Sequence, residues 1–143
     1  MTAFDTNILF PSLEPSHPSH ERARDFLHQL KGKEAGLCEL VLMETYVLVR
    51  NSSVCARPLD GPAAVAVVRR LRGNPQWRLL DYPGGLMDDV WQAAAQPSFA
   101  RRRIFDARLA ITLLSHGVTD FATANVKDFT GFGFAKVWNP LVA

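Results

Sequence analysis

The most informative feature of this 143-residue sequence is a set of polar side chains that interrupt apolar segments far apart in the chain. Asp5 follows the apolar start of the chain, Glu44 lies inside the run ELVLMETYVLVR, and Asp106 lies inside IFDARLA. Asn125 and Asp128 follow a further apolar segment near the C-terminus. A desolvated carboxylate is costly unless it is paired or bound to a metal, so these positions are candidates for chemistry.

Carboxylates that converge on one place predict a divalent cation. Like charges raise one another's pKa values, so three or four acids in one site cannot all stay ionised without a cation. The ion expected for oxygen ligands is Mg²⁺ or Mn²⁺, which keeps several of its waters. One or two such ions can activate a water and stabilise the leaving oxygen of a phosphodiester. Metal-dependent phosphodiester hydrolysis is therefore the chemistry that these residue types indicate.

Asp5 has two structural interpretations. As a carboxylate just after a first strand, it would stand at the edge of a parallel sheet where open α/β folds bind ligands. As the first residue of Asp5-Thr6-Asn7, it would close an Asx-turn or cap a helix, since all three are good turn and cap residues. The stretch alone leaves both interpretations open, and the acids further along favour the first.

Strands and helices alternate along the whole sequence. With no hairpin turn signals, this alternation predicts an α/β fold with a parallel sheet covered on both faces, in a single domain over residues 1–143. Three prolines predict a loop over residues 11–18, and Ala124 to Phe129 is expected to be a polar turn. The expected strands are the opening one before Asp5 and residues 35–38, 77–80, 118–123 and 135–138, and the expected helices are residues 19–31, 39–50, 62–72, 90–96 and 99–114.

The predicted sheet brings the polar residues together. Parallel strands with right-handed crossovers place all their carboxyl ends along one edge. Asp5, Asn125 and Asp128 share that edge, and Glu44 and Asp106 can reach it from helices that start on the same side.

Two of these acids also have ordinary interpretations. A glutamate in the middle of a helix, such as Glu44, is usually exposed to solvent. Asp106 lies near a helix N-terminus, where the helix dipole favours its ionised form. The apolar faces expected in these two helices are Leu40, Met43, Val47 and Leu48 in the first, and Ile104, Phe105, Leu109, Ala110, Leu113 and Leu114 in the second.

Composition narrows the class of protein. With 48% hydrophobic and 21% charged residues, the chain is an ordinary globular protein, and it has neither an apolar run that could span a bilayer nor an export signal. We therefore expect a cytoplasmic protein in which Cys38 and Cys55 are reduced thiols. The absence of a Gly-rich phosphate loop, a nucleophile elbow and a G-x-G-x-x-G motif weighs against nucleotide hydrolases, α/β-hydrolases and dinucleotide dehydrogenases.

The densest basic point is Arg101-Arg102-Arg103, with Arg108 further along the same expected helix. Such a cluster is often only a solvated helix start. It is also typical of a contact with the phosphate backbone of a nucleic acid, so these four arginines are the candidate RNA-binding residues.

Four motifs in series resemble the PIN-domain ribonucleases, and more narrowly the VapC-type toxins of bacterial toxin–antitoxin pairs. They are FDTNIL, ETYVLVRN, IFDARLA and FATANVKDF, and together they cover nearly the full chain in the family's order. The resemblance implies a three-layer α/β/α sandwich and Mg²⁺-dependent endonucleolytic cleavage of RNA, usually in loops of transfer or ribosomal RNA. It also implies an antitoxin protein as partner and a homodimer.

The same resemblance implies roles for individual residues. Asp5 and Asp106 would be the principal metal ligands, and Glu44 a third acid that holds a second metal or a ligand water. The family's fourth acidic position falls on Asn125, with Asp128 a turn later. Asn125 departs from the family pattern because an amide carbonyl can ligate or position water but brings no charge.

Thr6 and Thr123 are expected to hold ligating side chains in place by hydrogen bonds. Two other functions remain open at this point. A PIN-like module could grip nucleic acid through Arg101–Arg103 with little or no cutting, in which case binding would weaken steeply with salt. A phosphatase could use Asp5 as its nucleophile, although Asn7 occupies the place where such an enzyme has a second Asp.

Overall fold

A five-stranded parallel sheet organises the fold in the computed structural model, which describes residues 1–142. Its strand order is β3-β2-β1-β4-β5, and every neighbouring pair is parallel. The predicted α/β sandwich with a parallel sheet is confirmed. The predicted domain ends at Ala143, which lies outside the described residues. The strands are β1 (Thr2–Phe4), β2 (Ala35–Cys38), β3 (Arg78–Leu80), β4 (Asp120–Ala122) and β5 (Lys136–Trp138).

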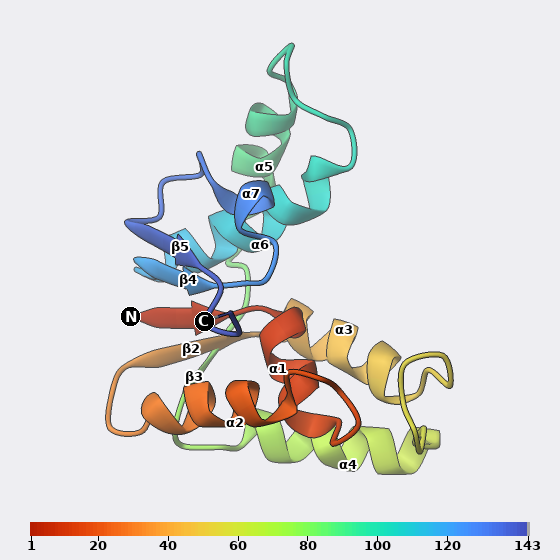
Figure 1. The fold of residues 1–143 in the computed structure, drawn as a ribbon. Coiled ribbons are helices and arrows are strands. Elements are labelled where there is room, and N and C mark those ends of the chain that lie inside the picture. Colours follow the sequence, from red (N-terminus) through yellow and green to blue (C-terminus); the bar gives the residue numbers. More distant parts are fainter. Residues whose placement is uncertain (143) are drawn as a thin grey trace.

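The helices form two groups around this sheet. Figure 1 shows α1 to α4 together at one end of the view and α5 to α7 at the other, with the sheet between them. None of the helices in residues 1–142 is both long and apolar enough to cross a membrane. The helices are α1 (Thr6–Leu13), α2 (His20–Gln29), α3 (Glu39–Val49), α4 (Gly61–Arg72), α5 (Leu86–Ala94), α6 (Arg103–Ser115) and α7 (Val126–Phe129).

The strand register aligns the polar residues that follow the central strands. Phe4 at the end of β1 pairs with Ala122 at the end of β4. The next residues on each strand are therefore Asp5 and Thr123, and the Asp5 backbone N–H donates to the Ala122 carbonyl at 2.9 Å. This register places both side chains at the carboxyl edge of the sheet.

Large buried apolar side chains pack against the strands and helix that form this edge. Phe4, Ile8, Leu37 and Phe121 are at most 1% exposed, and the Phe4 ring meets the Trp77 ring edge-on at 5.4 Å between centroids. Close-packed side chains of this kind resist displacement, so the backbone that carries Asp5 and Thr123 rests on a rigid base.

Helix α1 is the main departure from the predicted elements. The expected loop over residues 11–18 is wrong for its first three residues, because α1 continues to Leu13 with Pro11 inside it. A proline inside a helix costs about 3 kcal/mol. Burial of Ile8, Leu9 and Phe10 contributes roughly 1.5–3 kcal/mol for each side chain, so packing outweighs the local penalty.

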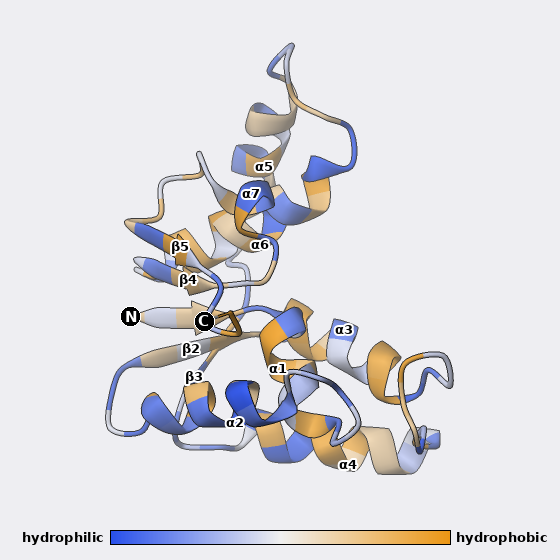
Figure 2. Cartoon of the chain, viewed as in Figure 1, coloured by the Kyte–Doolittle hydropathy of each residue, from blue (hydrophilic) through white to orange (hydrophobic). Residues whose placement is uncertain are grey.

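The predicted apolar face of α3 is only half right, because Leu40 and Leu48 pack against the core while Met43 and Val47 do not. Met43 and Val47 are each 62% exposed, whereas Val41, Leu42 and Val49 are buried. Figure 2 shows α3 as hydrophobic along most of its length. A helix that is apolar on nearly all sides gives no periodicity from which to choose its buried face.

Helix α6 begins at Arg103 rather than at residue 99, and its predicted apolar face is only partly right. Leu109, Ala110 and Leu113 are buried as expected. Phe105 is 72% exposed, so its assignment to the buried face is wrong.

Two smaller elements also differ from the prediction. Helix α5 begins four residues earlier than expected, directly after Gly85, whose φ of 87° is the left-handed conformation that glycine adopts most readily. The expected polar turn after β4 contains the one-turn helix α7, which carries Asp128.

Candidate active site

Asp5 combines the two positions that the sequence left open. It directly follows β1 and is the N-cap of α1, and its side chain is 7% exposed. Its Oδ1 accepts a hydrogen bond from the Thr6 backbone N–H at 2.7 Å, and its Oδ2 accepts one from the Thr123 hydroxyl at 2.8 Å. Burial raises the pKa of Asp5 above its ordinary value, while these two hydrogen bonds act in the opposite direction.

Thr123 connects Asp5 to the segment after β4. Its side chain is fully buried, and its hydroxyl donates to Asp5 while accepting from the Asn125 backbone N–H at 3.1 Å and from Asn7 Nδ2 at 3.3 Å. Asn7 Oδ1 in turn accepts from the Ala124 backbone N–H at 2.9 Å. Hydrogen bonds from Thr123 to Asp5 and between Asn7 and the Thr123–Ala124 pair therefore hold the segment after β4 to the start of α1.

Glu44 on α3 and Asp106 on α6 line the same cleft as Asp5, a cavity of about 420 Å³. Partial burial raises the pKa of Glu44 first, and the charges of Asp5 and Asp106 raise it further, against a contribution from the Thr6 hydroxyl. Partial burial also raises the pKa of Asp106, followed by the charges of Asp128 and Asp5, while Arg103 opposes the shift. The acids therefore act on one another across the cleft, as the sheet argument predicted.

Thr6 brings an unused hydroxyl to this cleft. Its side chain is 6% exposed, and within residues 1–142 its Oγ1 is the one buried side-chain polar atom without a hydrogen-bond partner. The hydroxyl affects the pKa of Glu44 but does not reach it with hydrogen-bond geometry. An unsatisfied buried hydroxyl costs about 1–3 kcal/mol, so it is a ready donor or acceptor for a bound water or ligand.

Asn125 and Asp128 occupy different places in the site. Asn125 is the exposed N-cap of α7 and lines the cleft. Asp128 is exposed on α7 and does not line the cleft, although its charge raises the pKa of Asp106. Asp128 therefore borders the acidic cleft from outside.

The donor set fits a hydrated hard cation. Within residues 1–142, no three His, Cys, Asp or Glu side chains lie close enough together to form a ready-made metal cage. Mg²⁺ does not require one, because it is usually held by one or two carboxylates and keeps several waters. Three carboxylates in the cleft, an amide on its rim and an unpartnered hydroxyl are oxygen groups that can hold such an ion or its waters.

Comparison with known proteins identifies the family. No family model matches the chain. The sequence is 48% identical to the ribonuclease VapC24 of Mycobacterium tuberculosis over 144 aligned residues, which cover all of this chain and 99% of VapC24. The chain belongs to the VapC ribonuclease family.

Several solved structures share its fold. The chain superposes on Mycobacterium tuberculosis VapC20, a sarcin–ricin loop cleaving toxin, with a TM-score of 0.71 and 17% identity over 94% of this chain and 96% of that one. It superposes on FitAcB from Neisseria gonorrhoeae with the same TM-score and 22% identity over the full length of both chains. A toxin–antitoxin complex from Klebsiella pneumoniae matches with a TM-score of 0.61, 19% identity and 98% coverage of each chain.

The candidate RNA-binding arginines of this VapC protein do not form one patch. Arg101 and Arg102 are exposed in the turn before α6. Arg103 donates to the Thr130 carbonyl at 2.8 Å and covers the Phe132 ring. Arg108 lies over the ring of Tyr82, in the loop after β3.

Two residues of the cleft were missed as site residues by the sequence analysis. Asn7 was considered as a turn or cap residue and as a departure from a phosphatase pattern, yet it lines the cleft and bonds to Thr123. Its signal in the sequence was the polar pair after Asp5. Phe105 lines the cleft with most of its ring exposed, and no signal separated it from the buried apolar residues of α6.

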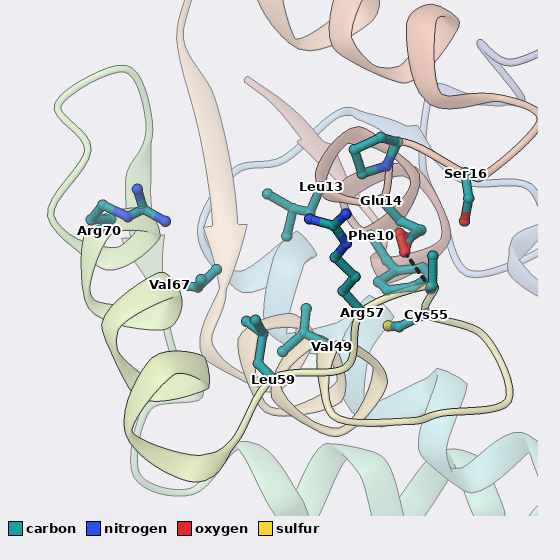
Figure 3. Close-up of a pocket in the computed structure, with 12 residues that line it drawn as sticks. Phe10, Leu13, Glu14, Ser16, Val49, Cys55, Arg57, Leu59, Val67 and Arg70 are labelled. Carbon is teal, nitrogen blue, oxygen red and sulfur yellow. Dashed lines mark hydrogen bonds between the residues drawn. The ribbon is translucent and has the colours of Figure 1, made fainter.

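A larger cavity lies away from these acids. It measures about 630 Å³ between α1, α3, α4 and the segment before α4, and apolar side chains including Phe10, Val49 and Leu59 line it (Figure 3). Glu14 is its single carboxylate and accepts a hydrogen bond from the Ala56 backbone N–H at 3.0 Å. The lining of this cavity therefore does not repeat the convergence of three carboxylates found in the cleft.

Proposed function

We propose that this protein is a Mg²⁺- or Mn²⁺-dependent endoribonuclease that acts as the toxin of a toxin–antitoxin pair. The observation that carries the proposal is the convergence of Asp5, Glu44 and Asp106 on one cleft, from three elements far apart in the sequence. Burial raises the pKa values of Glu44 and Asp106, and the charges of neighbouring acids raise them further, which is the situation that a bound cation would relieve. VapC24, with 48% identity over the full chain, is a ribonuclease.

Asp5, Asp106 and Glu44 would hold the metal, with Asn125 at the fourth position. When bound, the ion supplies an activated water and stabilises the leaving oxygen of the phosphodiester. Thr123 keeps the Asp5 carboxylate fixed through its hydrogen bond, and the free Thr6 hydroxyl can orient a water beside Glu44. Asn125 brings no charge, so the acids on α3 and α6 carry the negative charge opposite Asp5.

The substrate that we propose is a loop of structured RNA, in transfer RNA or ribosomal RNA. Unstacked loop nucleotides expose their backbone to a metal site and their bases to aromatic side chains. The exposed Phe105 ring at the cleft and the exposed Arg101 and Arg102 before α6 are groups suited to such contacts. VapC20, which shares the fold, is a sarcin–ricin loop cleaving toxin.

The partner that we propose is an antitoxin protein that covers the acidic cleft. The similarity to FitAcB and to the Klebsiella pneumoniae toxin–antitoxin complex supports this assignment. A cation from that partner, such as an arginine, would replace the metal as the counter-charge for the three carboxylates. We also propose a homodimer, and the cytoplasmic location stays a prediction.

The direct test is RNA cleavage by the purified chain with Mg²⁺ and with EDTA. We expect cleavage only with the metal, and a loss of about a hundredfold or more in Asp5→Asn, because this change removes a ligand charge. Asp89→Asn is the matched control, since Asp89 is an exposed acid in the first turn of α5. It should cut RNA as the parent does.

Thermal unfolding of each variant verifies that the fold is intact. If Asp5→Asn folds and cuts RNA as fast as the parent, the assigned site is wrong. If the parent binds RNA equally well with EDTA and never cuts it, the non-cutting nucleic-acid-binding alternative replaces the nuclease.

A further inference from the structure

A second, smaller cleft continues the acidic one along the same edge of the sheet. It measures about 240 Å³ and lies where β2 and β3 end, with Cys38 and Asp81 in its lining. Leu40, in the first turn of α3, lines both clefts. Because β2 lies between β1 and β3, the two clefts follow one another along adjacent strand ends.

Helix α6 also joins the two clefts. Phe105, Asp106 and Leu109 line the acidic cleft, while Arg108 and Thr112 line the smaller one. An RNA strand whose backbone passes Asp106 would therefore reach the smaller cleft within about one turn of α6.

An aromatic–cation pair forms one wall of the smaller cleft. The Arg108 guanidinium lies over the Tyr82 ring at 4.4 Å from its centroid, and Tyr82 is 43% exposed. Asp81 fixes the segment that carries Tyr82, because its carboxylate accepts from the Tyr82 backbone N–H at 2.8 Å and its carbonyl meets a ring nitrogen of His116 at 2.6 Å. The Tyr82–Arg108 pair is therefore fixed in position, and part of the tyrosine ring stays exposed to solvent.

We propose that this cleft is a nucleotide subsite, in which the Tyr82–Arg108 pair stacks on the base of a nucleotide next to the scissile phosphate. The inference rests on the nuclease function proposed above, and it adds a base-binding site that the acidic residues do not provide. Stacking on aromatic rings and arginine planes is how proteins bind unpaired bases.

Size and charge favour a base over other occupants. The cleft is smaller than the roughly 300 Å³ at which pockets for drug-sized ligands begin, which suits one flat ring system. In the lining of the smaller cleft, Arg108 stands with two carboxylates, Glu39 and Asp81, so this cleft does not attract a phosphate and suits an uncharged base.

The test uses a fluorescein-labelled, single-stranded ten-nucleotide RNA of random sequence as the probe, with EDTA present so that nothing is cut. Anisotropy should give an affinity that falls about fivefold or more in Tyr82→Leu and is retained in Tyr82→Phe, which keeps the ring. Arg108→Gln is a second variant that should weaken binding without touching Tyr82.

The matched control is a second tyrosine–arginine pair that lines neither the acidic cleft nor the smaller one. Arg50 donates to the Tyr46 hydroxyl at 2.7 Å and lies 5.5 Å from the ring centroid, on α3 away from the smaller cleft. Tyr46→Leu should bind the probe as the parent does. A thermal melt of every variant verifies folding.

Sequencing the ends of RNA cut by parent and Tyr82→Leu with Mg²⁺ supplies the second readout. We expect the base preference at one position beside the cut to relax and the others to persist.

If folded Tyr82→Leu and Arg108→Gln both bind and cut like the parent, the subsite is wrong while the nuclease stands. If the parent never cuts but Tyr82→Leu still weakens binding, the nuclease falls and the base-binding site stands. If Tyr82→Leu changes only the monomer–dimer equilibrium, the surface is a subunit contact and the subsite is overturned.

Discussion

Asp5 and Glu14 are both 7% exposed, and each lies in the wall of a cavity, yet their surroundings differ. Glu14 is the single acid in a larger, mainly apolar cavity and accepts a hydrogen bond from the Ala56 backbone N–H. Asp5 lines a smaller cleft with two further carboxylates, Glu44 and Asp106, whose pKa values are raised first by burial and then by neighbouring acids that include Asp5. Neither cavity volume nor the burial of one acid therefore identifies a hydrolytic site, whereas the convergence of several acids does.

The hydrogen bonds around the two acids also differ in what they hold. The bond from Ala56 ties the segment before α4 to the end of α1, which is a structural task. The bond from Thr123 ties the end of β4 to the acid at the end of β1, where the chemistry is proposed. Substitutions of Thr123 and of Glu14 should therefore have different effects on RNA cleavage.

The largest difference between the two regions is expected in cleavage rate. Thr123→Val keeps the shape of the side chain but leaves Asp5 Oδ2 without its donor, so we expect RNA cleavage to fall about 10- to 100-fold. Glu14→Gln should retain the parent's rate. Thr45→Val is the matched control, because Thr45 is also fully buried and its hydroxyl bonds only to the Val41 carbonyl within α3. Equal rates for Thr123→Val and Thr45→Val would contradict a positioning role for Thr123.

A smaller effect is expected on stability without metal. The folded chain holds the Asp106 proton to higher pH than the unfolded chain does, because the pKa of Asp106 is raised by folding. Stability from this group is therefore full below the ordinary aspartate pKa near 4 and is lost as pH rises through the raised value. In EDTA at pH 7, Asp106→Asn should melt a few degrees above the parent, and the difference should shrink towards pH 4.

Asp89→Asn controls for the loss of an acid from a first helical turn, since Asp89 has that position in α5 and Asp106 has it in α6. It should not raise the melting temperature. A melting temperature of Asp106→Asn at or below that of Asp89→Asn at pH 7 would show that neither partial burial nor the charges of Asp128 and Asp5 destabilise ionised Asp106.

The sheet could be predicted from the sequence because its signals are local. Short apolar segments such as AGLC and RLL lie between helical stretches, and this alternation was enough for a parallel sheet and its carboxyl edge. Helix α1 was not among the predicted helices, because Pro11 disfavours a helix locally and only burial against the rest of the chain reverses that preference.

The acidic residues of the site could be predicted from the sequence, whereas the aromatic and apolar residues around them could not. Asp5, Glu44 and Asp106 were chosen as acids in apolar surroundings, and the structure places all three in one cleft. Phe105 and Met43 are exposed, although apolar residues in a helix are expected to be buried, and only the tertiary arrangement separates such positions from the core. Tyr82 had no motif at all, because it lies in the loop after β3 and its partner Arg108 lies on α6, far along the chain.

The central claim is that the acids of the cleft, and not the acid of the larger cavity, hold a divalent ion. Titration of the metal-free chain with Mn²⁺, followed by electron paramagnetic resonance of the free ion, tests it most directly. We predict that the parent and Glu14→Gln bind Mn²⁺ alike and that Asp106→Asn binds it about tenfold more weakly or worse. Undiminished Mn²⁺ binding in folded Asp106→Asn, or its loss in folded Glu14→Gln, would contradict the account.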